Sequence, residues 1–465
     1  MTAAWRNVKA TRARPDTQPQ EPWIPLCMIK SSRCAGSFFF AGLSLISVAS
    51  AGRADSLSEF IAQGTPIVEL RVRSEQIDDA SKARSASAQT LRARLGYETM
   101  RWNGLQLAVD FDQVWSVGAP SYNSTRNGKT TYAVVSDPAM TALNRLQLSY
   151  ESEFKTSFVL GRQRLRIGNQ RFIGNAPWRQ HEQTFDALSV INTSIPDLTI
   201  TYAYLTRVNR TAGPDIPVPS DTTAAATNQA SYLKNNSHVL DGVYIGIAGL
   251  RLESYAFLLD IGAPGYASRP AQRLAAARLS SATIGGRADY NIPLAKDAGL
   301  TLSAEYAHQN GYADNPLSFD LNYWVLEAAV RAGPMRVLAS LEVLGGNGTI
   351  GFSTPQATLH AVNGWADLFT TTPANGLRDY HVLASYDIPV GPLPLQHITT
   401  MVVYHDFRND TAGAPIGSEW DMQMEMAVDP STSFFVKYAD YHGEGIGAGG
   451  APDKTCLWVF AAYKY

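Results

Sequence analysis

The chain has 465 residues, of which 17% are charged and 10% aromatic, and 39 Lys and Arg stand against 41 Asp and Glu. This slightly acidic balance argues against a nucleic-acid partner, which requires a basic surface. No stretch of eighteen apolar residues occurs, which argues against transmembrane helices.

Residues 28–54 are predicted to form a secretion signal, with a basic start, an apolar core over residues 38–48 and small residues near its end. Cleavage is expected after Ala51, with Ala54 as the second candidate. The alternative, an N-terminal anchor helix, is disfavoured by the shortness of the core. Residues 1–27 show no apolar pattern and are interpreted as an extension or a mis-assigned start.

From residue 66 to residue 465, after a short periplasmic lead-in over residues 55–65, eighteen stretches of about ten residues alternate apolar and polar. Side chains alternate between the two faces of a strand, so in the first stretch Val68, Leu70 and Val72 oppose Arg71 and Arg73. No helices or long apolar runs could cover so many apolar faces. A closed barrel solves this problem, because lipid takes the apolar face and a wet lumen takes the charges.

The predicted connections divide into eight short turns and nine longer loops, the longer ones including residues 116–143, 166–183 and 345–377. This is the pattern of a transmembrane antiparallel β-barrel with an even strand number, short periplasmic turns and long extracellular loops. The strands are predicted to begin near Pro66, Gln89, Leu105, Asn144, Phe158, Thr184, Leu198, His238, Leu250, Leu279, Leu300, Leu321, Arg336, Arg378, Ile398, Glu419, Thr432 and Thr455.

Aromatic residues mark the strand ends and the chain terminus. The last stretch places Leu457, Val459 and Tyr463 on one face and ends on Tyr465, which resembles the assembly signal of bacterial outer-membrane proteins. That resemblance implies the barrel-assembly machinery as a partner. Interface girdles are expected from Tyr202, Tyr204, Tyr290, Tyr306, Tyr386 and Tyr404.

The segment over residues 160–189 is the most distinctive, because it carries five arginines among amides and acids. Arginine offers forked donors that suit carboxylates, and a ring of arginines in a pore selects anions. Gly168 and Gly174 allow the loop to fold inward. A second inward basic set is expected on strands one and two. The predicted solute-contacting residues are Arg71, Arg73, Arg92, Arg94, Arg162, Arg164, Arg171, Arg179 and Asp186.

The fifth strand has an ambiguous alternation, because Phe158 and Leu160 share the parity of Arg162 and Arg164. An arginine on lipid at mid-bilayer costs roughly 2–4 kcal/mol. On that ground both arginines are expected to turn inward, leaving Val159, Gly161 and Leu165 facing outward.

Three motifs in this segment, GRQRLR (residues 161–166), NQRF (residues 169–172) and WRQHEQTFDA (residues 178–187), resemble the alginate-export porin family of Gram-negative outer membranes. The resemblance implies a constricted, arginine-lined pore for an anionic polyuronate or other anionic solutes. Many acids are also expected to point inward, which disagrees with a strongly basic pore; they are Glu69, Glu75, Asp110, Asp112, Glu151, Glu253, Asp289, Glu305, Glu327 and Glu342. The alternative is that arginines and acids neutralise each other and brace the wall.

A barrel hydrolase is the competing class. No G-x-S-x-G elbow and no metal-type histidine or cysteine spacing occurs, and the best candidate pairs are His405–Asp406 and His308 near Glu305. We therefore predict no catalytic, cofactor or metal site. The sequence indicates an outer-membrane porin, embedded in outer-membrane lipids, that passes polar and preferentially anionic small molecules or uronate oligomers. A general non-selective diffusion porin is the other alternative.

Overall fold

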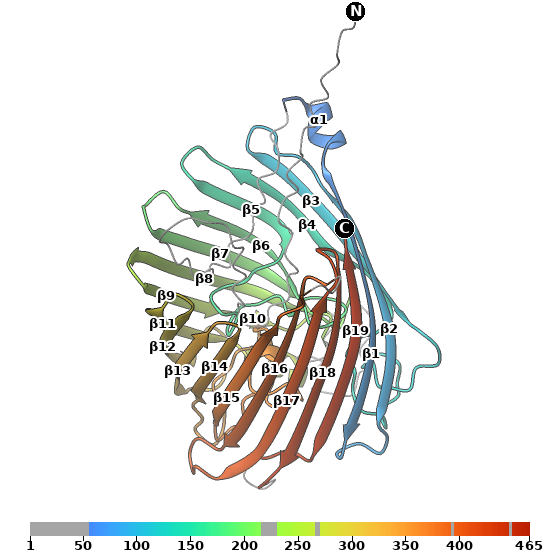
Figure 1. The fold of residues 1–465 in the computed structure, drawn as a ribbon, viewed down its shortest axis with the longest axis vertical. Helices are drawn as coiled ribbons and strands as arrows, with labels where there is room; N and C mark the ends of the chain where they lie inside the picture. The colour runs from blue at the N-terminus through green and yellow to red at the C-terminus, as the bar shows by residue number, and fades with distance from the viewer. Residues whose placement is uncertain (1–54, 215–229, 266–269, 392–394, 446–448) are drawn as a thin grey trace, which may run out of the picture.

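The computed structural model describes residues 55–214, 230–265, 270–391, 395–445 and 449–465. The predicted secretion signal and N-terminal extension fall on residues 1–54 and lie outside the described residues. Figure 1 shows tilted strands side by side in a curved wall. All of them belong to one antiparallel sheet, and the sheet closes because β1 pairs with both β2 and β19.

Eighteen long strands build the wall, and the two-residue β10 adds a short pairing with β8. The strands are β1 (Thr65–Asp79), β2 (Ala86–Glu98), β3 (Leu105–Ser116), β4 (Met140–Glu151), β5 (Thr156–Gln163), β6 (Thr184–Asn192), β7 (Leu198–Asn209), β8 (Tyr232–Ile247), β9 (Leu250–Leu259), β10 (Ile261–Gly262), β11 (Ser281–Ala295), β12 (Ala298–Gly311), β13 (Asp320–Ala332), β14 (Met335–Leu344), β15 (Leu377–Ile388), β16 (His397–Arg408), β17 (Pro415–Ala427), β18 (Thr432–Gly443) and β19 (Lys454–Lys464). The predicted barrel of about eighteen strands is confirmed. The largest difference between a predicted and an observed strand start occurs at β8, which begins at Tyr232 rather than near His238.

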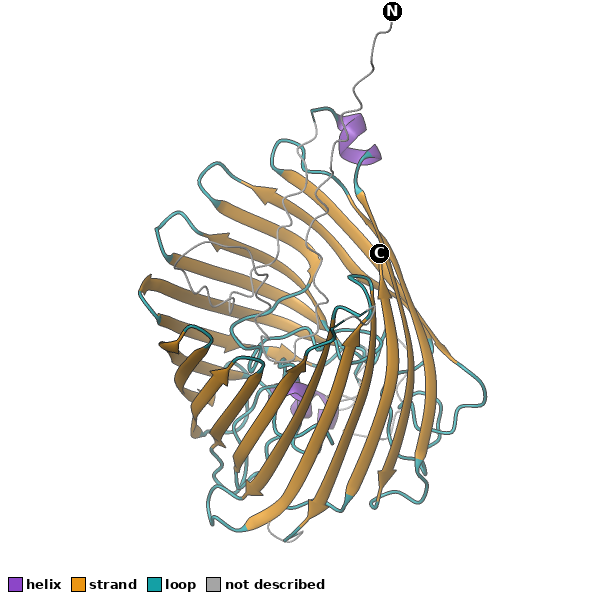
Figure 2. Cartoon of the chain, in the orientation of Figure 1, coloured by secondary structure: helices purple, strands orange, loops and turns teal. Residues whose placement is uncertain are grey.

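Helical structure is sparse among the described residues (Figure 2). It consists of α1 (Leu57–Ala62), α2 (Pro270–Ala277) and the 3-10 turn η2 (Leu359–Ala361). Ser56 caps α1 by accepting a hydrogen bond from the Glu59 amide. In the described part of the chain, no helix has the length and apolar character that a membrane crossing requires.

The two faces of the wall differ as the alternation predicts. On β1, Leu70 and Val72 are exposed on the outside, whereas Arg71, Arg73 and Glu75 are buried inside. Large apolar side chains remain exposed on the outer face all around the barrel, as at Leu95, Leu148, Leu240, Leu326, Met422 and Val459. Such a continuous apolar exterior is stable only in contact with lipid.

The connections separate into two classes, as predicted. Short turns join β2 to β3, β4 to β5 and β13 to β14, whereas the connections after β3, β5, β7 and β14 are long. The first and last strands meet at the short-turn end, where the Tyr465 amide donates to the Val68 carbonyl at 2.9 Å.

The expected outward orientation of Val159 and Leu165 is wrong, whereas Arg164 lies inward as expected. Phe158 and Leu160 face outward, with 39% and 59% of their surface exposed, while Val159 and Leu165 are buried. Gly161 lies between the two arrangements with a φ of +113°, a conformation that an L-residue rarely adopts. The apolar side chains Phe158 and Leu160 therefore face the lipid. The regular alternation of the strand ends at Gly161, just before the arginines.

Candidate functional site

Two long connections cross the lumen and join each other. We call residues 164–183, between β5 and β6, the first lumen loop, and residues 345–376, between β14 and β15, the second lumen loop. They meet through a parallel bridge between Ile173 and Gln356. The Gly174 amide donates to the Gln356 carbonyl at 2.9 Å, and the Thr358 amide donates to the Gln170 carbonyl at 3.1 Å. The predicted inward fold of the first loop is therefore present.

The basic set on β1 and β2 holds the backbone of the first lumen loop. Arg71 donates to the Pro177 carbonyl at 3.0 Å, and Arg73 donates to the Trp178 carbonyl. Arg92 reaches the Gln180 carbonyl at 3.4 Å and forms an ion pair with Glu69 at 2.9 Å. These arginines are nearly fully buried. They act first as anchors of the loop.

Glu182 links the two arginine sets that the sequence predicts. Its carboxylate lies 2.7 Å from Arg94 and 2.6 Å from Arg164, and it also accepts a hydrogen bond from Asn144 at 2.8 Å. Burial opposes its ionisation, yet Arg164 and Arg94 hold the pKa of Glu182 well below its usual range. The carboxylate is therefore charged and compensates these arginines. Arg164 is the more accessible of the two, with 21% of its side-chain surface exposed.

Arg171 and Arg179 connect the lumen loops to two wall strands, β14 and β1. Arg171 donates to Glu342 on β14 at 2.6 Å and to Asn363 of the second lumen loop at 3.0 Å. Arg179 pairs with Glu75 on β1 and with Asp367 of the second loop, each at 3.2 Å. Each arginine thus bridges one wall strand and both loops.

Arg162 and Asp186 form a pair of their own between β5 and β6. The Arg162 guanidinium donates to both carboxylate oxygens of Asp186, at 2.7 and 3.1 Å, and to the Leu143 carbonyl. Arg162 follows Gly161, where the regular alternation of β5 ends, and its cross-strand partners are Leu146 and Asp186. The structure brings the other predicted arginines together, and their contact with solute stays a prediction.

Trp178 is the centre of an aromatic and cationic stack that joins both loops to the wall. Its ring stacks on His360 with centroids 4.1 Å apart and planes 10° from parallel. Arg73 and Lys437 approach the Trp178 ring, each at 4.2 Å from its centroid. Trp458 on β19 packs against it edge-on. Cations over a desolvated indole ring are attracted by its quadrupole, so this stack fixes the loops.

The protonation state of His360 follows from its two partners. His360 Nδ1 lies 2.8 Å from the Asp367 carboxylate, and Nε2 lies 3.2 Å from Lys437 Nζ. An ammonium donates to a lone pair, which requires Nε2 to be unprotonated. Burial lowers the pKa of His360 to about 3; Asp367 opposes this shift and Lys437 strengthens it. The imidazole is therefore neutral at pH 7.

We expect the barrel to lose stability as the pH falls from 6.5 towards 3, because the unfolded chain then binds a proton that folded His360 excludes. For one group the slope reaches up to about 1.4 kcal/mol per pH unit. Urea unfolding of His360→Gln across this range should show a flatter pH dependence. The exposed His308→Gln should keep the wild-type slope. Equal slopes for wild type and His360→Gln would contradict this prediction.

The catalytic pairs considered from the sequence do not form among the described residues. His405 hydrogen-bonds Asp379 at 2.8 Å, while Asp406 pairs with Arg408. His308 lies 3.5 Å from Asp320, and Glu305 pairs with Arg287.

Sequence reasoning missed three features of the lumen. The roles of Trp178, His360 and Lys437 were not predicted, although Trp178 lies within the third motif. The second lumen loop was predicted only as a long loop. The cluster of Asp379, His381 and His405 spans two strands, so its members show no metal-type spacing along the chain.

The closed antiparallel barrel, its apolar exterior and its polar interior crossed by two loops define a transmembrane β-barrel. No family model and no curated protein matches the sequence. The resemblance to the alginate-export family is therefore not confirmed.

Solved structures share the fold. The barrel aligns with Acinetobacter baumannii OccAB2 at a TM-score of 0.64 and 14% identity, over 88% of this chain and 99% of that one. Pseudomonas aeruginosa OpdQ gives 0.62 at 15% identity, over 87% and 99% of the two chains. The outer membrane protein OprD of P. aeruginosa gives 0.60 at 13% identity, over 86% and 94%.

Proposed function

We propose that this barrel is a porin for the passive passage of small polar solutes across the outer membrane, with a preference for anions. The observation that carries the proposal is the presence of two partly exposed guanidinium groups, Arg164 and Arg179, on the first lumen loop. Fixed guanidinium groups beside a pore attract carboxylates and phosphates. The inward loops supply the constriction at which such charges act on a solute.

In this proposal, the preference for anions depends on the arginines whose side chains are partly exposed in the lumen. Most of the predicted arginines are buried against carboxylates and carbonyls, so they hold the loop rather than a solute. Arg164 and Arg179 are partly exposed and sit on the loop itself. Uronate oligomers, the solutes implied by the resemblance to alginate-export porins, would present carboxylates to these residues. The many inward acids make small anions a better match than a long polyanion.

We expect Arg164→Ala to lower anion preference in planar lipid bilayers, because it removes an accessible positive charge and leaves Glu182 with Arg94 as its remaining ion-pair partner among the described residues. The measurement is the reversal potential across a salt gradient. Arg408→Ala is the matched control, since Arg408 is an arginine at a strand end that pairs with Asp406. A cation-selective wild-type pore that Arg164→Ala leaves unchanged would overturn the anion preference.

A non-selective diffusion porin is the alternative within the same class. It predicts equal permeation of neutral and anionic sugars of one size in liposome-swelling assays, whereas our proposal predicts faster entry of the uronate. The hydrolase alternative predicts turnover of lipid or peptide by the purified barrel. A turnover assay with the wild-type protein distinguishes it directly.

A further inference from the structure

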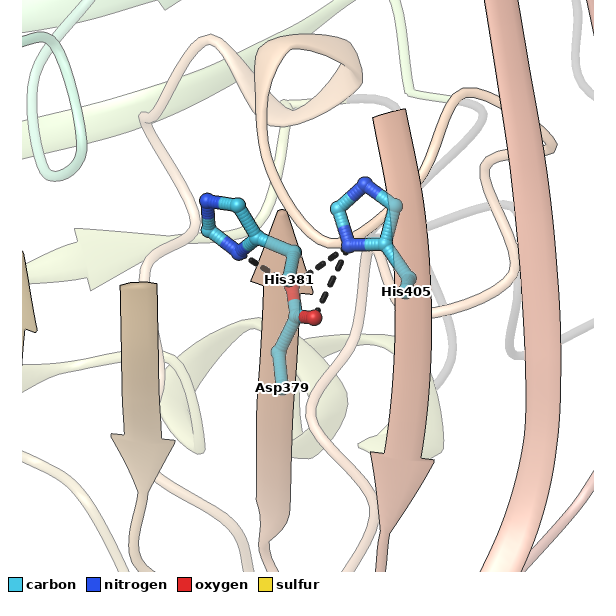
Figure 3. A group of neighbouring side chains, drawn as sticks. All are labelled: Asp379, His381 and His405. Carbon is cyan, nitrogen blue, oxygen red and sulfur yellow. Dashed lines mark hydrogen bonds and ion pairs between the residues drawn. The ribbon is translucent and has the colours of Figure 1, made fainter. Parts of the chain in front are cut away.

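A second group of polar side chains lies on the inner face of β15, β16 and β17. Asp379 and His381 come from β15 and His405 from β16, and Figure 3 shows both imidazole rings turned towards the Asp379 carboxylate. His405 Nδ1 lies 2.8 and 3.1 Å from the two carboxylate oxygens, and His381 Nδ1 lies 3.6 Å from the nearer one. One candidate ligand atom from each residue lies within 4.8 Å of the others.

The strand register creates this group. His381 is the direct cross-strand partner of His405, which is in turn the partner of Glu419 on β17. Alternating positions place Asp379 and Asp421 on the same inner face. Five ligand-type side chains therefore gather on three neighbouring strands, although no two of them are closer than two positions in sequence.

The second lumen loop covers the group from inside. Asn363 donates to Asp379 at 3.1 Å, the Trp365 amide donates to Asp421 at 3.2 Å, and the Ala366 amide donates to Glu419 at 2.7 Å. This close approach depends on Gly364, whose φ is +83° and where a Cβ would lie 2.4 Å from Glu419 Oε2. Asp379, Glu419 and Asp421 are completely buried as a result.

Several polar atoms of the group lack a hydrogen-bond partner among the described residues. They are His381 Nδ1, Glu419 Oε2 and Asp421 Oδ1. Buried carboxylate oxygens and imidazole nitrogens are costly without a partner.

We propose that Asp379, His381 and His405 bind a divalent transition-metal ion of the zinc type. Two imidazole nitrogens and one carboxylate oxygen are a donor set that zinc and its neighbours accept. Zn–N and Zn–O bonds of about 2.0–2.2 Å place tetrahedral ligand atoms about 3.3–3.5 Å apart. The spacings of 2.8 and 3.6 Å between ligand atoms bracket that value.

The neighbouring carboxylates fit the same assignment. His405 Nε2 lies 3.5 Å from Asp421 Oδ2, so the nitrogen that does not face Asp379 points at a carboxylate. A carboxylate on the far nitrogen of a ligating histidine fixes its orientation and raises its basicity. The metal would replace the proton between His405 Nδ1 and Asp379. It would join β15 to β16 beneath the second lumen loop.

The test uses the full-length mature barrel, purified in detergent without a histidine tag and stripped with EDTA. Titration with Co²⁺ should give one equivalent of visible absorption, which Zn²⁺ should displace. His381→Gln should weaken Co²⁺ binding by at least about 100-fold, because loss of even an outer-shell partner costs 10–100-fold. His381 Nδ1 makes no hydrogen bond to another described residue, so the variant should fold. Heat-modifiable migration on gels verifies this.

His442→Gln is the matched control, because exposed His442 faces a single carboxylate, Asp440, at 3.5 Å. It should bind Co²⁺ like wild type, and His405→Gln should lose binding like His381→Gln. Absence of Co²⁺ and Zn²⁺ binding by the folded wild type would overturn the proposal. Equal binding by all four proteins would also overturn it, because the ion would then be held elsewhere. Neither result depends on the pore's solute preference.

Discussion

Trp178→Ala should open the lumen and destabilise the barrel by about 3–5 kcal/mol, the usual cost of truncating a buried tryptophan. Trp178 is 1% exposed and its ring contacts His360, Arg73 and Lys437. Its loss leaves two cations without the indole face and separates the first lumen loop from the second at this stack. The measurements are single-channel conductance, which should rise, and urea unfolding in detergent.

Trp115→Ala is the control for tryptophan content and expression. Trp115 lies on the outer face of β3 with 44% of its surface exposed, so its removal leaves the lumen intact. We expect its conductance to equal that of wild type. If Trp178→Ala conducted like Trp115→Ala, the stack would not hold the lumen loops.

Glu182→Gln should shift the reversal potential towards stronger anion selectivity and lower stability by about 3 kcal/mol or more. The substitution keeps the shape of the side chain but removes the charge shared by Arg94 and Arg164. Breaking a buried ion pair by neutralising one partner is costly, because the other charge remains. Arg94 retains Asp112 at 2.6 Å, so the uncompensated charge falls on Arg164.

Glu153→Gln, in the exposed turn between β4 and β5, is the matched control. It removes the same charge from the chain at a position outside the lumen. A Glu182→Gln pore with wild-type selectivity would show that Arg164 does not act on permeating ions.

The fold was predictable because alternation is a local property of each strand. Val68 to Glu75 reveal their two faces without reference to any partner, and a turn needs only its own Gly, Pro, Asn or Asp. At β5 this reasoning failed. The penalty for a lipid-facing arginine was applied to the whole strand, but Gly161 changes the backbone conformation just before the first arginine.

The candidate site was less predictable because its contacts join distant segments. Arg71 was recognised as inward, but its partner is a carbonyl 106 residues away, at Pro177. The bridge between Ile173 and Gln356 and the approach of His381 to His405 likewise depend on how loops and strands close in space. Residue type and parity identify which side chains face the lumen, whereas pairing within the lumen requires the three-dimensional arrangement.

The main-chain carbonyls of residues 177–180 accept hydrogen bonds from three wall arginines, Arg71, Arg73 and Arg92. A main-chain oxygen is present whatever amino acid occupies the position. These three contacts therefore do not depend on the side chains of the stretch, to which Trp178, Arg179 and Gln180 add contacts of their own. A substitution at Pro177, for example, is expected to leave the hydrogen bond between Arg71 and the carbonyl of residue 177 in place.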